Sequence, residues 1–192
     1  MLTRLYRNLP NLLSAFRVLL APFVAAAILN GRTPAALAML AAAGLSDLLD
    51  GYLARRMGVS SRLGSYLDPL SDKFLLVTVY LCEGLAGRLP AWLVALVLGR
   101  DLLILAMAAY AMAAVQVRQF PPSFWGKLST VVQIVVALIV LADGGRVLDR
   151  GLVLATVSVV TAWSGIHYVR YAAAALRVLL RQRAIDGGAG RG

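Results

Sequence analysis

Long runs of apolar residues follow one another along the chain, and short polar segments separate them. A helix needs about 20 apolar residues to cross a bilayer. Runs of about this length occur at six places, residues 11–30, 34–54, 64–86, 90–115, 123–142 and 151–175. Gly and Pro, which interrupt helices, cluster between the runs, as at Asn30-Gly31, at Gly87 with Pro90, and at Pro121-Pro122. The pattern predicts an all-α membrane protein with six transmembrane helices.

The two ends of the chain differ from the apolar runs. Residues 2–9 carry Arg4 and Arg7 among apolar side chains, which predicts a short interfacial amphipathic helix before the first span. The Gly-rich stretch 186–192 is predicted to be a disordered tail. Because no internal repeat or linker divides the rest, residues 1–185 are predicted to form a single transmembrane domain.

Composition supports a lipid-facing surface. Hydrophobic residues make up 60% of the 192 residues, and charged residues only 15%, against about 25% in a typical soluble protein. The formal net charge is +10, but the basic residues lie mostly at the ends of the apolar runs. We therefore expect anionic lipid headgroups and a charged lipid substrate as partners, and no nucleic acid.

The distribution of basic residues predicts the orientation in the membrane. With six spans, eleven Lys and Arg residues fall on the side of both termini, and four fall on the other, namely Arg32, Arg88, Arg146 and Arg150. Basic residues accumulate on the cytoplasmic side of membrane proteins. Both termini are therefore expected in the cytoplasm, as in a multi-pass protein of the cell (inner) membrane.

Four carboxylates lie where the apolar pattern predicts membrane helices. Asp47 and Asp50 fall near the cytoplasmic end of the second span, and Asp68 and Asp72 at the same end of the third. Each ionised group in a span costs at least about 2.5 kcal/mol. Helical spacing places each pair on one face, and the short connection should bring the pairs together. Oxygen ligands alone favour hard cations, so we expect Mg²⁺ or Mn²⁺, with two ions per site for phosphoryl chemistry.

Two other interpretations of these charges are open. Arg55, Arg56 and Lys73 could neutralise some of the carboxylates, so that the group locks two helices together. A transporter also places charges in its spans, although its sites lie near the midplane of the bilayer. Here the charges gather near one membrane face, which favours an enzyme.

The same residues form a longer pattern: Asp47-x2-Asp50-Gly51-x2-Ala54-Arg55-x8-Gly64-x3-Asp68-x3-Asp72. The pattern resembles the signature of the CDP-alcohol phosphatidyltransferase family, and Pro10-Asn11-Leu12-Leu13-Ser14-x2-Arg17 resembles the family's amino-terminal element. The resemblance implies a six-helix membrane fold, usually a homodimer, whose site opens to the cytoplasm. It implies transfer of a phosphatidyl group from CDP-diacylglycerol to an alcohol, with release of CMP.

The resemblance also implies roles for individual residues. Asp47, Asp50 and Asp68 would ligate the metal ions, and Asp72 would ligate or adjoin them and act as the general base. The CDP-lipid would be held near Asn11, Gly51, Ala54, Arg55 and Gly64.

The acceptor is indicated by a second group of residues. Arg100 lies within the fourth span, and Arg118 precedes Gly126-Lys127-x2-Thr130, which resembles the family branch with glycerol-type acceptors. Arg100, Arg118 and Lys127 are therefore predicted to bind the acceptor. Phosphatidylglycerophosphate synthases often have Glu after the span-four arginine and a further Arg, whereas Asp101 stands here. Glycerol 3-phosphate and phosphatidylglycerol stay open as acceptors, with inositol phosphate as an alternative.

The predicted orientation can be tested with cysteine labels. In a background without Cys82, Ser60→Cys and Gln119→Cys should react with a membrane-impermeant maleimide only from the cytoplasm. Gly145→Cys should react only from the opposite side. Labelling of intact and of opened cells measures this, and the reverse pattern would overturn the orientation.

Overall fold

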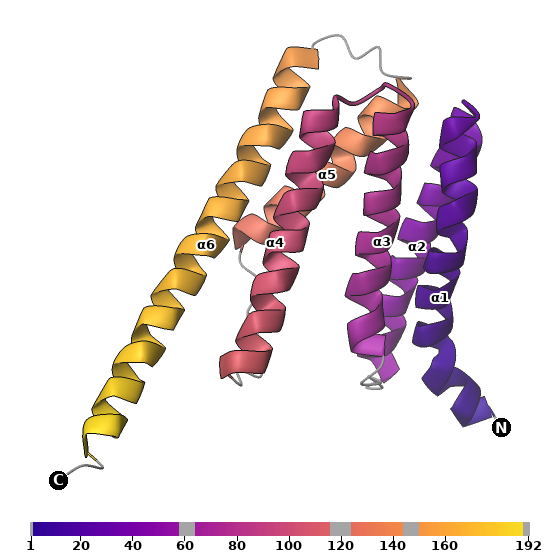
Figure 1. The fold of residues 1–192 in the computed structure, drawn as a ribbon. Coiled ribbons are helices and arrows are strands. Elements are labelled where there is room, and N and C mark those ends of the chain that lie inside the picture. The colour runs from indigo at the N-terminus through magenta and orange to yellow at the C-terminus, as the bar shows by residue number, and fades with distance from the viewer. Residues whose placement is uncertain (1, 58–63, 116–123, 144–149, 190–192) are drawn as a thin grey trace. The chain divides into compact units, whose positions relative to one another are not determined.

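A computed structural model describes residues 2–57, 64–115, 124–143 and 150–189 (Figure 1). In this part of the chain the regular structure is helical throughout, with no strand. The helices are α1 (Leu2–Leu29), α2 (Thr33–Met57), α3 (Gly64–Leu85), α4 (Ala91–Val115), α5 (Phe124–Ala142) and α6 (Arg150–Ala189). The all-α fold class is confirmed.

Each predicted apolar run corresponds to one helix, but the two ends of the chain differ from the prediction. Residues 2–9 are helical, as predicted, but they form the start of α1, which continues through Pro10 without a break. That they lie at the membrane interface stays a prediction. An apolar environment favours helix continuity, because every broken backbone hydrogen bond there is costly. Helix α6 continues to Ala189, into the stretch predicted as tail.

Two helices satisfy a strict test for membrane crossing by length and composition. These are the segments Phe124–Ala142 and Gly151–Ala174, with mean hydropathy of 2.0 and 1.5. Large apolar side chains are exposed on other helices as well, among them Leu19, Phe23, Leu48 and Leu102. Exposed apolar surface of this kind is expected where lipid surrounds a protein. That all six helices cross the bilayer stays a prediction.

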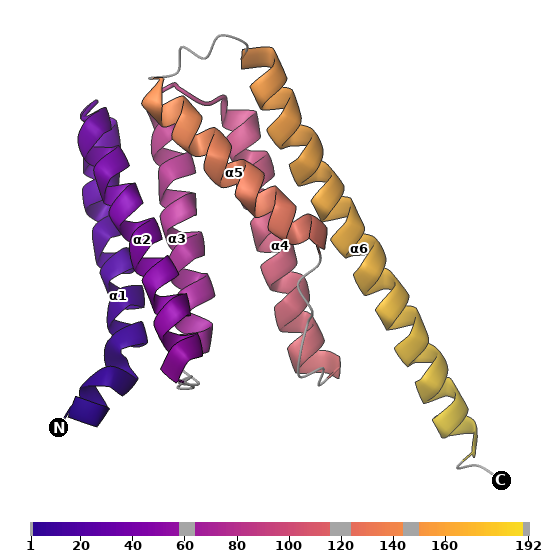
Figure 2. The ribbon, with the colours of Figure 1, turned by 180° about the vertical axis from the view of Figure 1, so that it is seen from behind.

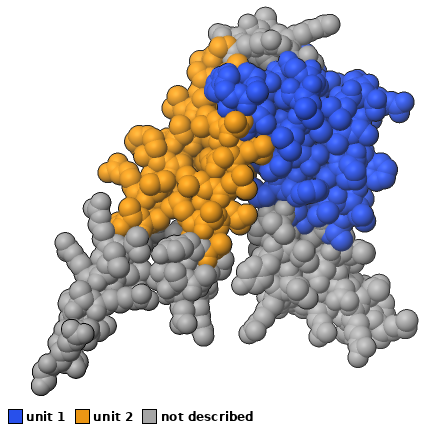
Figure 3. Space-filling view, in the orientation of Figure 1, with its two compact units in different colours: residues 1–94, 134–150 blue, residues 95–133, 151–192 orange. Residues whose placement is uncertain are grey.

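The chain divides into two compact units, drawn in blue and orange in Figure 3. The first unit comprises residues 1–94 and 134–150. Within it, α1 packs against both α2 and α3, as the views from the front and from behind show (Figures 1 and 2). Its buried core includes Val24, Ile28, Val79, Tyr80 and Leu141. This unit carries the carboxylate motif.

Two predicted turns of the first unit are confirmed. Gly31 and Gly87 have φ angles of 68° and 70°, in the left-handed region that glycine adopts without steric cost. After α1, the Arg32 N–H donates to the Ala27 carbonyl at 2.8 Å, which satisfies one of the last carbonyls of the helix. After α3, Arg88 Nη2 donates to the Ile28 carbonyl at 3.4 Å, so the two turns are joined.

The second unit comprises residues 95–133 and 151–192, which belong to α4, the first half of α5 and α6. Its interior is unusually polar for an apolar sequence. Alongside Val97 and Val157, the buried residues include Ser129, Gln133, Thr161 and Ser164. Buried polar groups require hydrogen-bond partners, and these groups lie where α4, α5 and α6 meet. This unit carries the residues predicted to bind the acceptor.

Candidate functional site

The carboxylate motif lies on the end of α2 and the start of α3, on either side of the connection 58–63. Both stretches are helical, so the predicted spacing of Asp47 with Asp50, and of Asp68 with Asp72, corresponds to single helical turns. The side chains of Asp50, Asp68 and Asp72 lie outside the described residues, as do those of Asn11, Gly51, Ala54, Arg55 and Gly64. The convergence of the four carboxylates therefore stays a prediction.

Asp47 is bound by an arginine from α1. Arg17 Nη1 donates to Asp47 Oδ1 at 2.6 Å. The Arg17 side chain is only 1% exposed, whereas that of Asp47 is 48% exposed. A buried guanidinium without an anion would be very costly, so the ion pair explains how α1 tolerates Arg17. It also fixes the place where α1 meets the carboxylate motif.

The chemistry of the donors fits a hard cation. Arg17 engages one carboxylate oxygen of Asp47, and a carboxylate has a second oxygen that can bind a metal. No group of three or more metal-ligating side chains occurs among the side chains that the structure describes, and three of the four predicted ligands lie outside that part. The positive charge of Arg17 offsets part of the repulsion among neighbouring carboxylates.

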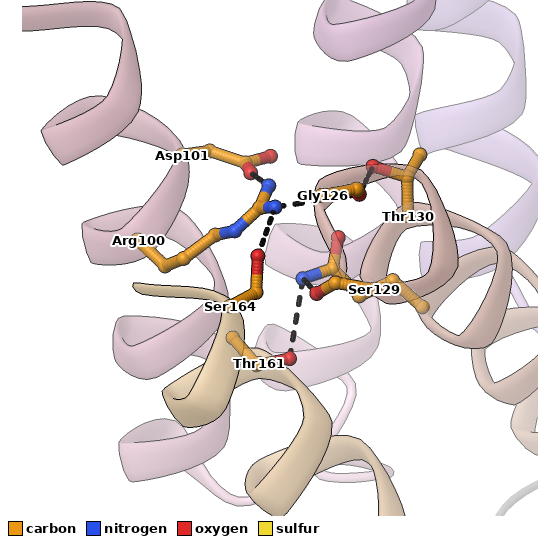
Figure 4. A network of polar contacts seen from close by, with 8 residues as sticks. Arg100, Asp101, Gly126, Ser129, Thr130, Thr161 and Ser164 are labelled. Atoms are coloured by element: carbon orange, nitrogen blue, oxygen red, sulfur yellow. Dashed lines mark hydrogen bonds and ion pairs between the residues drawn. The ribbon is translucent and has the colours of Figure 1, made fainter. Parts of the chain in front are cut away.

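Arg100 of α4 is at the centre of a polar network in the second unit (Figure 4). Its Nη1 donates to Asp101 Oδ1 at 2.6 Å, and its Nη2 donates to Ser164 Oγ at 2.6 Å. Nη2 also lies 3.4 Å from the Gly126 carbonyl oxygen. The guanidinium carbon lies 5.9 Å from the centre of the Tyr168 ring. One side chain thus contacts α4, α5 and α6.

The Gly126-Lys127-x2-Thr130 element forms the first turns of α5. A Cβ atom on Gly126 would lie 2.7 Å from the Tyr168 hydroxyl oxygen, so only glycine fits there without movement. The Thr130 hydroxyl donates to the Gly126 carbonyl at 3.1 Å. Two turns after Gly126, Gln133 Nε2 donates to Thr161 Oγ1 of α6 at 3.2 Å. The element therefore fixes α5 against α6.

Lys127 is exposed, and it lies in the first turn of α5. A cation at this end of a helix is repelled by the helix dipole, which instead favours anions. No ion pair of Lys127 occurs within the described part of the chain. Arg118, the other predicted acceptor residue of this region, lies outside the described residues.

A cavity of about 490 Å³ lies between α4 and α6 in the second unit. Its walls are mostly apolar and include Gly99, Leu103, Gly165 and Ile166, with Arg100 and Arg170 as the charged residues. Because Arg100 is buried and Arg170 is exposed, Arg170 is the cation of this cavity that solvent and headgroups reach. Arg170 was not predicted from the sequence.

Three further residues of the two sites were given no site role from the sequence, namely Ser164, Tyr168, and Arg17, which was named only as part of the amino-terminal element. Arg17 offered a usable signal, because an arginine inside an apolar run needs an anionic partner. Ser164 and Tyr168 offered none, since serine and tyrosine are ordinary in membrane helices. Their roles follow from the tertiary packing of α6 against Arg100 and Gly126.

Comparison with known proteins identifies a family that matches most of the chain, and several relatives. A model of the CDP-alcohol phosphatidyltransferase family matches residues 7–179. A rice chloroplast CDP-diacylglycerol–glycerol-3-phosphate 3-phosphatidyltransferase is 44% identical over 57% of this chain and 33% of its own length. The rat cardiolipin synthase (CMP-forming) is 35% identical over 73% of this chain and 53% of its own length.

A probable phosphatidylglycerophosphate synthase of Mycobacterium tuberculosis is 32% identical over 84% of this chain and 80% of its own length. The chain thus spans less than two thirds of the rice and rat relatives, but most of the mycobacterial one. The name of the rice relative includes glycerol 3-phosphate, and the rat relative is named for cardiolipin.

Removal of Arg17 should destabilise the first unit. Arg17→Ala deletes a buried side chain and its charge-assisted hydrogen bond to Asp47, which is worth about 1.5–3 kcal/mol. Arg32→Ala, which truncates an exposed arginine just after α1, is the matched control. Thermal unfolding of the purified variants in detergent measures the difference. Equal melting temperatures for the two variants would show that the ion pair contributes nothing to stability.

Proposed function

The chain belongs to the CDP-alcohol phosphatidyltransferase family, and on this basis we propose that it transfers a phosphatidyl group from CDP-diacylglycerol to a glycerol-type alcohol. The family match over residues 7–179 carries the proposal, because it includes both the carboxylate motif and the α5 element. The product is a phospholipid, and CMP is released. A transporter would not require the complete family pattern from Asp47 to Asp72.

Asp47, Asp50, Asp68 and Asp72 would hold Mg²⁺ or Mn²⁺, two ions per site. When bound, such ions neutralise the pyrophosphate and stabilise the charge of the leaving CMP. The family in general depends on divalent metals, and an all-carboxylate donor set suits hard cations. Arg17 keeps the Asp47 carboxylate in one place through its 2.6 Å bond, which preorganises one ligand of the site.

The acceptor hydroxyl attacks the phosphorus that carries the diacylglycerol. A new P–O bond forms to the acceptor, and the P–O bond to the phosphate of CMP breaks. Asp72 takes the proton of the attacking hydroxyl as the general base, which requires hydrogen-bond reach to that hydroxyl. Gly51, Ala54 and Gly64 leave space for the cytidine nucleotide, with Arg55 and Asn11 beside it.

Lys127 binds the phosphate of the acceptor. The exposed ammonium lies in the first turn of α5, where the backbone N–H groups at a helix start also attract an anion. An anion bound here would remove the repulsion between Lys127 and the helix dipole. Arg118 is a second contact. Direct binding of the acceptor by Arg100 stays a prediction. Its guanidinium is already bound to Asp101 and Ser164, so a phosphate would compete with these partners.

The charge near Arg100 favours a singly charged acceptor. Asp101 lies 2.6 Å from the guanidinium, so the pair contributes little net positive charge. Glycerol 3-phosphate is doubly charged near neutral pH and needs several cations. Phosphatidylglycerol carries one charge and adds acyl chains that a membrane enzyme can bind. The geometry therefore favours phosphatidylglycerol, which would yield cardiolipin, with glycerol 3-phosphate as the second candidate.

The protein would act as a multi-pass enzyme of the cell membrane, with both termini and the site in the cytoplasm. The family is membrane-bound, and the asymmetry of basic residues supports the orientation. The protein would form a homodimer, as its family usually does.

The reaction can be tested directly with purified protein. In vesicles containing CDP-diacylglycerol, it should release CMP when phosphatidylglycerol or glycerol 3-phosphate is added, and mass spectrometry should identify the lipid product. A chelator should abolish turnover, and Mg²⁺ or Mn²⁺ should restore it. Asp72→Asn should lower kcat by about 100-fold or more. No CMP release with any acceptor would refute the proposed function.

Lys127→Ala should raise the apparent KM of the acceptor by about tenfold or more, because a charge-assisted contact is lost. The KM of CDP-diacylglycerol should change little, and Lys127→Arg, which keeps the charge, should retain most of the affinity. Steady-state kinetics with each substrate varied in turn measures both values. An unchanged acceptor KM would place the acceptor phosphate elsewhere.

A further inference from the structure

The buried guanidinium of Arg100 connects the first turn of α5 to two other helices. It is bound to Asp101 of its own helix and to Ser164 of α6, and it approaches the Gly126 carbonyl of α5 (Figure 4). Its side chain is only 6% exposed. An arginine presents its donors in a fixed planar fork, so three oxygens bound to one fork keep fixed positions relative to one another.

The α5 residue at this fork directly precedes the lysine of the proposed acceptor site. The Gly126 carbonyl accepts from both Arg100 and Thr130, and the Gly126 Cα is closely packed against Tyr168. Peptide geometry is stiff, so a restrained Gly126 restrains the Cα of Lys127 as well. The Lys127 side chain remains exposed.

A second polar contact prevents rotation of α5 about this point. Gln133, two turns after Gly126, donates to Thr161 of α6 and to Ser129 of its own helix. Thr161 and Ser164 are three residues apart, so they lie on one face of α6. Both contacts are buried, where hydrogen bonds are costly to break. The first half of α5 is thus attached to α6 at two points.

Arg100 is poorly suited to bind a substrate anion itself. Its charge is compensated by Asp101 at 2.6 Å, and the Asp101 side chain is only 9% exposed. A phosphate that bound Nη1 or Nη2 would have to displace Asp101 or Ser164 and would leave a buried group without a partner, which costs free energy. The Nε atom has no hydrogen-bond partner within the described part of the chain, but it is buried.

We propose that Arg100, with Ser164, is a positioning residue: it fixes the first turn of α5 and thereby sets where Lys127 meets the acceptor phosphate. The proposal rests on the proposed function of Lys127. A positioned ammonium loses less conformational freedom on binding than one on a mobile turn. Loss of the support should therefore weaken acceptor binding without changing the chemistry at the carboxylate motif.

Ser164→Ala is the most specific test, because Ser164 is fully buried and would not contact substrate. It should raise the acceptor KM about threefold to tenfold, with kcat and the KM of CDP-diacylglycerol within about twofold of wild type. Ser158→Ala is the matched control, since Ser158 lies on the same helix and donates only to the Leu154 carbonyl within it. Arg100→Lys, which keeps the charge but loses the fork, should behave as Ser164→Ala does.

The double variant Ser164→Ala/Lys127→Ala separates positioning from general damage. If Ser164 acts through Lys127, its removal should have no further effect on acceptor KM once Lys127 is absent. If the effects of the two substitutions on the acceptor KM multiply, the positioning role is wrong. It is also wrong if Ser164→Ala impairs kcat and both KM values to the same extent.

Hydrogen exchange provides a measurement that does not require activity. Ser164→Ala and Arg100→Lys should speed amide exchange in a peptide covering residues 124–133, and Ser158→Ala should not. If both variants speed amide exchange as expected but the wild-type protein releases no CMP, the proposed function is refuted. Normal transfer by wild type, with unchanged exchange in both variants, would refute the positioning role alone.

Discussion

An ionised side chain placed inside an apolar helical protein must find its counter-charge within the protein, and this constraint organises both units of the structure. Arg17 in α1 is almost fully buried and is bound to Asp47 of α2. Arg100 in α4 is bound to Asp101, its neighbour in sequence. Without these partners, each guanidinium would carry a desolvation cost of several kcal/mol. Helices α1 and α2 therefore have to meet where Arg17 is compensated, whereas Arg100 is compensated within α4.

The two arginines meet this constraint in different ways, and the difference bears on function. Asp47 is nearly half exposed, so Arg17 supports a carboxylate that a cation can still reach. Asp101 is almost as buried as Arg100, so that pair is much less accessible to a ligand. The second terminal nitrogen of Arg100 donates to Ser164 and Gly126. One pair leaves its carboxylate accessible, and the arginine of the other also binds a backbone carbonyl of α5.

Sequence predicts most of the fold because the apolar runs are long and their breaks carry Gly and Pro. The structure has a helix at each predicted run, and the expected turns occur at Gly31 and Gly87, both with positive φ. The continuity of residues 2–9 with the first span was not predicted, because local composition does not show that α1 continues through Pro10. The grouping of α1 with α2 and α3 depends on tertiary packing, and residue spacing within one helix does not encode it.

The candidate site was only partly predictable for the same reason. Charged residues in spans are conspicuous, so the four aspartates, Arg100 and Lys127 stand out in the sequence. The partners that determine what a charge can do are mostly neutral, and they come from distant segments: Ser164 and Tyr168 lie more than 60 residues from Arg100. Sequence thus identifies where charge is placed, but only the fold shows whether that charge is already used.

Whether a cation is already paired within the protein determines whether it can select the acceptor. A cation that discriminates between substrates must gain more interaction free energy from the bound anion than it loses when it leaves water or another partner. Arg100 would have to give up Asp101 and Ser164, whereas Lys127 is exposed at a helix start that itself favours an anion. Selectivity is therefore expected to reside in Lys127, and the buried network contributes by limiting where that ammonium can go. An acceptor whose single phosphate charge is matched by the positioned Lys127, with Arg118 as the second proposed contact, would obtain its remaining affinity from the surrounding lipid-facing surface.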